Sequence, residues 1–272
     1  MNNTSRNYQE EVDDRYRVGA VSFFNARPLI YGLDNHSRVL LQPKVPAQLG
    51  LDLNSGAIDV GLVPSIDYQT SRSDWLILPI AAIGSEGEVL TVRVFSQQPL
   101  DEIDCLACDT DSHTSVALAR IIWHLRYGRS LAVKPLRDVK SESAILLIGD
   151  KVLGQLGRWP HELDLGAAWT QLTLLPFVYA FWAVPPETET NADVLAGILQ
   201  RTCREGIANI DDIIECYAGQ HGFDDEIARR YFADNIVFDF GARQRQGLTR
   251  FYELAYQLQL VPQQRPLRFF PL

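Results

Sequence analysis

An alternation of strand-like and helical stretches in the first third of the chain limits its possible folds more than any other feature. The strand-like stretches are short apolar runs, expected at residues 18–23, 39–44, 58–63, 76–83 and 89–96. Helical stretches at residues 28–33 and 47–54 separate the first three runs. This order is typical of a mostly parallel sheet covered by helices, so we expect an α/β unit here.

A second unit of the same kind begins near residue 100. Its strands are expected at residues 103–108, 131–135 and 145–148, and its main helix at residues 116–127. An apolar strand at residues 177–184 then returns the chain to the first unit. The helices after it are expected at residues 192–207, 210–218, 225–232 and 247–260.

The predicted organisation is therefore a two-lobed α/β protein. Residues 1–16 are expected to be a disordered lead-in, residues 17–96 and 178–272 to form lobe 1, and residues 97–177 to form lobe 2. Two crossover strands, near residues 94 and 178, join the lobes. A central cleft with a hinge follows from this connectivity.

The composition describes a soluble globular protein and argues against several partners. Hydrophobic residues make up 46% of the 272 residues and charged residues 22%, which is enough for a substantial core. The net charge of −9 argues against nucleic acid and against an anionic membrane as partners. Residues 1–17 lack the apolar core of a signal peptide, and no apolar run is long enough to span a membrane. We therefore expect a cytoplasmic protein, and its oligomeric state stays open.

The four cysteines invite a disulfide or a metal site, but their placement favours neither. Cys105 and Cys108 have the CxxC spacing, yet they lie in a strand-like run, where residues three apart point to opposite faces. Cys203 and Cys216 lie in helical patterns far away in the sequence, with no second CxxC and no nearby histidine pair. We expect buried free thiols and no metal site.

The motifs that usually mark nucleotide, zinc or serine chemistry are absent from the sequence. It contains no GxGxxG, no GKS/T phosphate loop, no HExxH and no GxSxG, and residues 61–65 read GLVPS. The five histidines are scattered along the chain, at His36, His113, His124, His161 and His221. Composition and spacing therefore indicate a hinged protein that binds a small anion.

Polar side chains follow the predicted strands at the edge where open α/β folds hold their ligands. Asn25 stands where the first strand turns into a helix, and Ser65 follows the third strand. In the second unit, Thr114 and Ser115 begin a helix, and Asp150 follows a strand. Amides and hydroxyls at a helix start can hold a carboxylate. A purely structural interpretation also stands, in which Asn25 and the hydroxyls only cap helices.

Ordered segments along nearly the whole chain carry a resemblance to a known family. They are VSFFNARPL (21–29), GAIDVGLVPS (56–65), VLTVRVFS (89–96), DTDSHTSVAL (109–118), AILLIGD (144–150), DLGAAW (164–169) and LLPFVYAFW (174–182). This combination resembles the chorismate dehydratase family, which serves the futalosine route of menaquinone biosynthesis. The sister enzyme of that route typically opens its first loop with Cys-Pro-Asn-Asp, whereas this loop reads SFFNARPL, which favours the dehydratase.

The resemblance implies a fold, a reaction and a set of site residues. The fold is the two-lobed type II periplasmic-binding-protein fold, and the reaction removes water from chorismate to give 3-[(1-carboxyvinyl)oxy]benzoate. Aromatisation of the ring drives that reaction, so neither a redox cofactor nor a metal is implied. Asn25 would orient the ring and its leaving hydroxyl through its amide. The residues expected to bind substrate are Ser65, Thr91, Thr114, Ser115 and Asp150.

The proton acceptor is open between two groups. Asp150 is one candidate, although a loop-stabilising role suits it better, and a carboxylate of the substrate itself is the acceptor that we favour. Three positions depart from the family pattern: His113 stands where arginine is common, Thr91 where serine is common, and Leu174 where a glycine is usual. Thr91 keeps the hydroxyl, whereas His113 removes an expected arginine contact to a substrate carboxylate.

Two other functions remain compatible with the sequence. The fold is shared by transport receptors, so the chain could be a solute-binding or sensor protein for a small carboxylate. It could also be an enzyme of the same family with a shifted substrate, which His113 and Leu174 would permit.

Overall fold

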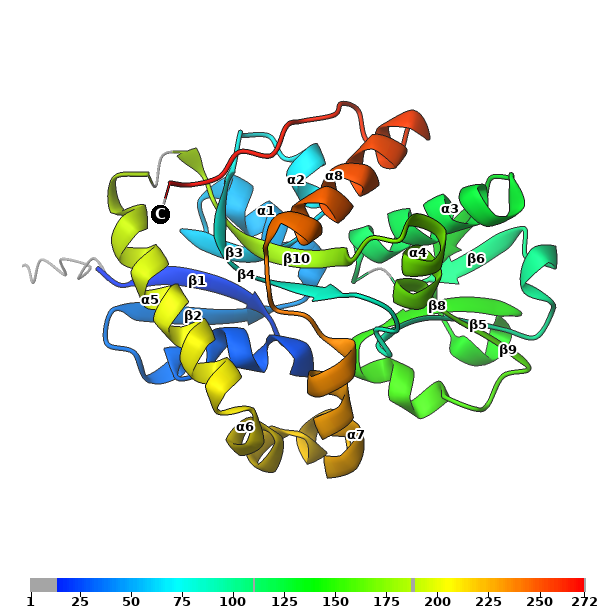
Figure 1. Cartoon of the computed structure of the whole chain (residues 1–272), viewed down its shortest axis with the longest axis horizontal. Helices are drawn as coiled ribbons and strands as arrows, with labels where there is room; N and C mark the ends of the chain where they lie inside the picture. The colour runs from blue at the N-terminus through cyan, green and yellow to red at the C-terminus, as the bar shows by residue number, and fades with distance from the viewer. Residues whose placement is uncertain (1–13, 110, 187–188, 272) are drawn as a thin grey trace, which may run out of the picture.

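The computed structural model describes residues 14–109, 111–186 and 189–271, which form two α/β lobes side by side (Figure 1). The first lobe contains a five-stranded sheet in the order β2-β1-β3-β10-β4. Its strands are β1 (Tyr16–Val21), β2 (Val39–Lys44), β3 (Val60–Pro64), β4 (Leu76–Ser85) and β10 (Phe177–Val184). β1 runs parallel to β2 and β3, whereas β10 is antiparallel to β3 and β4.

The second lobe repeats this plan in a sheet of the order β7-β6-β8-β5-β9. Its strands are β5 (Val92–Ser96), β6 (Cys105–Cys108), β7 (Ala132–Pro135), β8 (Ala144–Ile148) and β9 (His161–Asp164). β6 is parallel to β7 and β8, and β5 is antiparallel to β8 and β9. The predicted fold class, an α/β protein of two lobes, is confirmed.

Helices join and cover the strands. The α-helices are α1 (Pro46–Ser55), α2 (Asp67–Thr70), α3 (His113–Tyr127), α4 (Leu165–Thr173), α5 (Glu189–Ala208), α6 (Ile210–Tyr217), α7 (Asp225–Arg230) and α8 (Ala242–Gln257). The 3-10 helices are η1 (Phe24–Ile30), η2 (Leu33–Asn35), η3 (Leu100–Glu102), η4 (Val139–Ser141), η5 (Gly149–Gln155) and η7 (Gly219–His221), and η8 (Tyr231–Asn235) is a π-helix. Among the described residues, no helix has the length and apolar character needed to cross a membrane.

The chain crosses between the lobes twice, once between β4 and β5 and once between α4 and β10. The sequence prediction includes residues 92–96 in lobe 1, but β5 pairs with β8 and β9 of the second sheet. We therefore place the first crossing at residues 86–91 and the return at residues 174–176. A strand-like pattern shows where a strand lies but not which sheet it joins, because pairing depends on distant residues.

The first turn after β1 differs from its prediction. The sequence suggests that Asn25 caps a helix at residues 28–33, but η1 already spans Phe24–Ile30, and Phe23 is its N-cap residue. Asn25 therefore lies inside η1, without a capping role. Of the predicted lead-in at residues 1–16, residues 1–13 lie outside the described residues, and Tyr16 begins β1.

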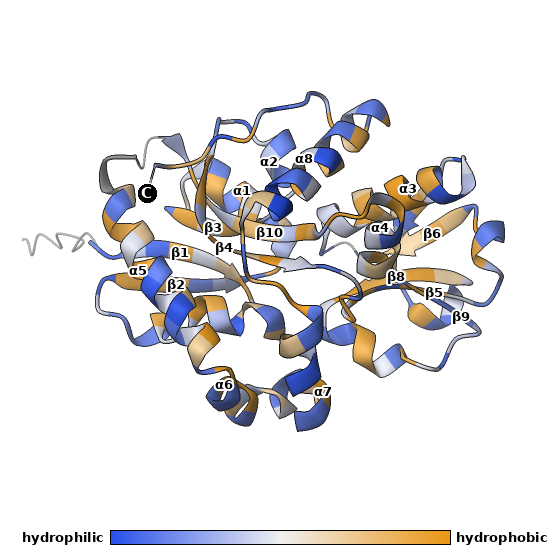
Figure 2. Ribbon diagram, viewed as in Figure 1, coloured by the Kyte–Doolittle hydropathy of each residue, from blue (hydrophilic) through white to orange (hydrophobic). Residues whose placement is uncertain are grey.

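Apolar residues concentrate in the strands, and hydrophilic residues in the outer helices such as α6 and α7 (Figure 2). The strands β3, β8 and β10 are buried along their whole length, as expected of central strands covered on both faces. All four cysteines are free, and Cys105 is exposed while Cys108 is buried. The prediction of free thiols and the opposite orientation of Cys105 and Cys108 are confirmed, but the prediction that the thiols are buried is wrong for Cys105 and Cys216, which are exposed.

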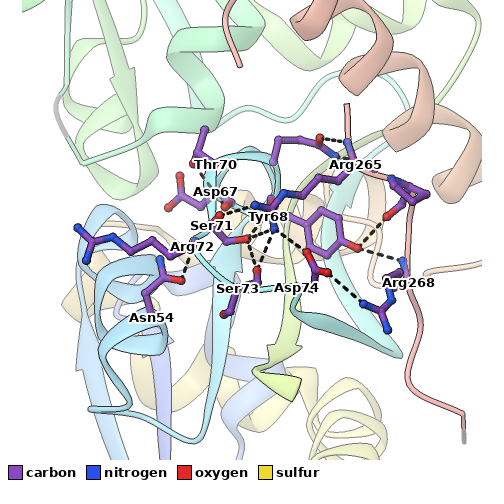
Figure 3. Close-up of polar contacts among 12 residues, drawn as sticks. Asn54, Asp67, Tyr68, Thr70, Ser71, Arg72, Ser73, Asp74, Arg265 and Arg268 are labelled. Atoms are coloured by element: carbon purple, nitrogen blue, oxygen red, sulfur yellow. Dashed lines mark hydrogen bonds and ion pairs between the residues drawn. The ribbon is translucent and has the colours of Figure 1, made fainter. Parts of the chain in front are cut away.

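The C-terminal tail is held on lobe 1 by the segment that contains α2 (Figure 3). Arg265 Nη1 donates to Ser71 Oγ at 3.0 Å, to Ser73 O at 2.9 Å and to Asp74 Oδ1 at 3.1 Å, and Nη2 donates to Ser71 O at 2.7 Å. Its side chain is only 17% exposed. Arg268, by contrast, reaches Asp74 only at 3.4 Å and its side chain is 54% exposed. Arg265 is therefore the main polar anchor of the tail.

We expect Arg265→Ala to lower the free energy of unfolding by roughly 2 to 3 kcal/mol, because it leaves backbone carbonyls of the α2 segment without their charged donor. The matched change Arg268→Ala removes an exposed pair and should cost less than about 1 kcal/mol. Urea unfolding of both variants measures the difference, and equal losses would contradict the assigned role of Arg265.

Candidate active site

A cavity of about 50 Å³ lies between the two lobes. Its walls come from both lobes and the first crossing: Val21, Phe23, Asn25, Pro46, Pro64, Ile83, Val89, Thr91, Val92, Ser112, Ser115, Ile148, Gly149, Tyr179 and Ala180. Pockets for small molecules usually measure roughly 300 to 1,000 Å³. The described conformation is therefore a closed one, and the lobes have to separate before a ligand can enter.

Polar contacts between the lobes hold this closed conformation. Ala47 N donates to Asp111 O at 3.1 Å, and Ile66 N donates to Thr114 Oγ1 at 3.2 Å. On the side of η1, Phe24 N donates to the carboxylate of Asp150 at 3.3 Å. Each of these donors and acceptors can bind water instead when the lobes open, so opening exchanges these hydrogen bonds for bonds to water.

Asn25 lies on the cavity wall at the start of η1. Its Oδ1 atom is buried and has no hydrogen-bond partner among the described residues. A buried acceptor without a donor costs roughly 1 to 3 kcal/mol, and such atoms require an explanation. Since Asn25 lines the cavity, a bound ligand with a hydrogen-bond donor would be a partner for this atom.

Thr91 lies on the same wall and is oriented by Tyr231 of η8. The two hydroxyl oxygens are 2.7 Å apart, and Tyr231 is 1% exposed. Burial raises the pKa of Tyr231, while its hydrogen bonds with Thr91 and with the Asn25 side chain act in the opposite direction. Tyr231 therefore contacts both polar groups of this wall in its protonated form. Sequence reasoning missed it, because the C-terminal helices contain no recognisable motif.

The hydroxyls at the start of α3 have different roles. Ser112 Oγ accepts from Ser115 N at 3.1 Å and donates to Ser115 Oγ at 2.9 Å. The Ser115 hydroxyl accepts this bond, so its own proton is free to point into the cavity. Thr114 does not line the cavity, because its Oγ1 accepts from Ile66 N of the other lobe.

Two other predicted substrate contacts are also absent from the described cavity lining. Ser65 Oγ is buried and donates to Val178 O at 2.8 Å, which joins the end of β3 to β10. Gly149 reaches the cavity, but the next residue, Asp150, contacts Phe24 and His221 instead. In this conformation, Asn25, Thr91 and Ser115 are the predicted site residues that the structure brings together.

The cavity walls are uncharged. Among the described residues that line it, none is an aspartate, glutamate, lysine, arginine or histidine, and Tyr179 alone has a titratable side chain. Burial, together with the nearby charge of Asp164, raises the pKa of Tyr179 well above its usual value, so it stays protonated. An anion in this cavity would be held by hydroxyls, amides and the positive end of α3.

Two of the three positions that depart from the family pattern, His113 and Leu174, lie outside this cavity. His113 Nδ1 is 2.8 Å from Asp67 Oδ1, so the pair links the lobes. Burial raises the pKa of Asp67, and the hydrogen bond with Asp67 raises the pKa of His113. Leu174 ends α4 and is 77% exposed. Neither residue lines the walls, so neither directly shapes the substrate cavity.

A second, open groove of about 520 Å³ lies at the lobe boundary beside α3. Asp67 and His113 line it together with Arg120, but Asn25, Thr91 and Ser115 do not. The groove is larger than the cavity, yet it contains none of the converging groups described above. The smaller cavity is therefore the candidate active site.

Comparisons with known proteins define the class of the fold. The alkanesulfonate-binding protein SsuA from Xanthomonas axonopodis pv. citri superposes with a TM-score of 0.69 at 13% identity, over 93% of this chain and 96% of that one. The Candida albicans CA3427 gene product, described as having the generic periplasmic binding protein structural fold, gives 0.64 at 10% identity, over 95% and 98%. The chain thus has a periplasmic-binding-protein-like fold, as predicted.

The sequence comparisons define the family. A curated chorismate dehydratase from Thermus thermophilus is 29% identical over 260 residues, which cover 88% of this chain and 94% of that protein. The family model described as menaquinone biosynthesis matches residues 16–257. The chain belongs to this menaquinone biosynthesis family, and the predicted resemblance is confirmed.

Leu174 provides a direct test of one family departure. Its φ of +61° is left-handed, a conformation that costs a non-glycine residue roughly 1 to 2 kcal/mol. We expect Leu174→Gly to raise the free energy of unfolding by about 1 kcal/mol, because its side chain makes little buried contact that could be lost. Urea unfolding measures this gain.

A glycine two residues earlier should have the opposite effect. Leu172 lies within α4 and is 38% exposed, so Leu172→Gly should lower the free energy of unfolding by about 1 kcal/mol. If both variants were less stable than the wild type, the left-handed backbone at Leu174 would not be a source of strain.

Proposed function

We propose that this protein is a chorismate dehydratase, a hydro-lyase that converts chorismate to 3-[(1-carboxyvinyl)oxy]benzoate in menaquinone biosynthesis. The buried, unpartnered Oδ1 of Asn25 carries this proposal beyond family membership. Chorismate at neutral pH has two carboxylates and one hydroxyl, at ring carbon C4, so this hydroxyl is its one strong hydrogen-bond donor. The Asn25 oxygen would accept from it and place the leaving group.

The reaction needs a proton acceptor that the cavity walls do not offer. No carboxylate or imidazole lines the described cavity, and Tyr179 stays protonated. We therefore assign the acceptor role to the substrate carboxylate on the side chain attached through oxygen to C3. The C3–H bond electrons form the new ring double bond and the C4–O bond breaks. The departing hydroxide takes the former C3 proton from the substrate carboxyl group and leaves as water, which restores the carboxylate.

The remaining polar groups suit the two carboxylates of the substrate. The Ser115 hydroxyl and the start of α3 can hold one of them from lobe 2, and the Thr91 hydroxyl faces the same space from the first crossing. Each is a neutral donor fixed by neighbours before the ligand arrives, which strengthens its interaction in a cavity without bulk water. Ser65 and Thr114 support these elements instead of contacting the substrate.

We expect Asn25→Ala to lower kcat for chorismate by at least roughly 100-fold, the size of effect found when one preorganised polar group is removed from an active site. The measurement is the change in ultraviolet absorbance with time, which follows the formation of the aromatic product and the loss of chorismate. The matched control is Asn35→Ala, at an exposed asparagine ten residues later, which should leave both kcat and KM unchanged.

A melting temperature of Asn25→Ala equal to that of the wild type would show that the substitution leaves the fold intact. Near-normal turnover by this variant would exclude the assigned role of Asn25. Tight binding of chorismate by the wild type without any product would instead indicate a solute-binding or sensor protein for a small carboxylate.

A further inference from the structure

Asp150 crosses from lobe 2 to the segment that carries Asn25. Its Oδ1 accepts from Phe24 N at 3.3 Å, and its Oδ2 lies 2.6 Å from His221 Nδ1. The side chains of Asp150 and His221 are only 22% and 11% exposed, so solvent screens this pair weakly. Both oxygens of Asp150 are thus engaged outside the cavity, next to the amide that precedes Asn25.

Arg27 determines which nitrogen of His221 carries the proton. Arg27 Nε lies 3.3 Å from His221 Nε2, and a guanidinium can only donate. His221 Nε2 is therefore the acceptor, and Nδ1 carries the proton that it donates to Asp150. The Arg27 guanidinium is in turn stacked over the Tyr217 ring at 4.4 Å, which fixes its position.

These contacts hold η1 on both sides of Asn25. Phe24 precedes Asn25 and Arg27 follows it by two residues, and both bind the His221–Asp150 pair. The Phe24 ring also stacks on the His221 ring with centroids 5.4 Å apart. A 3-10 helix has poorer internal hydrogen bonds than an α-helix and seldom exceeds one turn, so η1 depends on such external contacts.

We propose that His221 is a positioning residue, which acts through Asp150 to fix Asn25 for catalysis when the lobes close. This inference rests on the proposed dehydratase function. Because Asp150 belongs to lobe 2 while Phe24, Arg27 and His221 belong to lobe 1, the network is complete only in the closed conformation. Closure of the lobes therefore also fixes η1, the segment that carries Asn25.

A second histidine–aspartate pair makes it possible to distinguish this positioning role from a role in lobe closure alone. His113 and Asp67 also join the two lobes, at 2.8 Å, but they lie at the starts of α3 and α2 and make no described contact with η1. If the histidine pairs acted only by favouring the closed conformation, the two pairs would have equivalent effects. If His221 positions Asn25, its loss alone lowers the rate of the chemical step.

Two substitutions of His221 by residues with amide side chains test whether the hydrogen bond donated by Nδ1 to Asp150 is required. In His221→Asn the side-chain nitrogen stands as many bonds from the backbone as Nδ1, so it can still donate to Asp150. In His221→Gln the nitrogen reaches the place of Nε2, and this donor is lost. We expect His221→Gln to lower kcat roughly 10- to 100-fold with KM within about threefold, and His221→Asn to stay within about fivefold of wild type.

The matched control is His113→Gln, which should alter KM and leave kcat within about twofold. Hydrogen exchange of the backbone amides of residues 24–30 gives a readout independent of turnover, and it should accelerate in His221→Gln but not in His113→Gln. Equal kcat losses for the two His221 variants, or unchanged exchange in residues 24–30, would overturn the positioning role. Absence of product with the wild type would overturn the proposed function instead, while the exchange measurement still tests the network.

Discussion

A single unpaired amide oxygen in an uncharged cavity is the constraint on which the other features depend. Asn25 Oδ1 is buried without a donor, which the folded protein tolerates only because surrounding contacts hold Asn25 in place. Tyr231 supports its side chain, and the Asp150 network supports its backbone. If η1 relaxed, this oxygen could find a partner within the protein. A rigid η1 therefore keeps the Asn25 oxygen unpaired and available to a ligand.

The two lobes supply this rigidity without preventing entry of a ligand. The contacts between them include hydrogen bonds and ion pairs, as between Ile66 and Thr114 or between Asp67 and His113. Such groups regain partners from water when the lobes separate, so these polar contacts add little to the cost of opening. The lobes can therefore open for substrate and close around it, while each keeps its own sheet intact.

Local sequence patterns predicted the elements well and their tertiary partners poorly. Strands at residues 39–44 and 177–184 have the predicted bounds, because their apolar runs are bounded by clear turn residues. The sheet that residues 92–96 join depends on pairing with distant strands, and the prediction was wrong there. Polar residues at strand ends were a useful guide to the site, but no pattern shows whether Ser65 or Thr114 points into the cavity.

The missed residues contact partners that lie far from them in the sequence. Tyr231 lies 140 residues from Thr91, and His221 lies 71 residues from Asp150. The C-terminal helices that carry them present ordinary amphipathic patterns, and a lone histidine or tyrosine in such a helix has no local signature. Their role follows only from the packing of Phe24 against Phe223 and Tyr231, which brings these helices onto η1.

The absence of charge from the described cavity walls also suits the elimination reaction that we propose for this periplasmic-binding-protein-like fold. A carboxylate base on the wall would repel a dianionic substrate, and in a closed cavity that repulsion is barely screened. In the proposed reaction, neutral donors would bind the dianion without this conflict and would leave one of its carboxylates basic enough to take the C3 proton. Binding and catalysis would then require the same walls, and Asn25 would add an acceptor that holds the leaving hydroxyl beside the breaking bond.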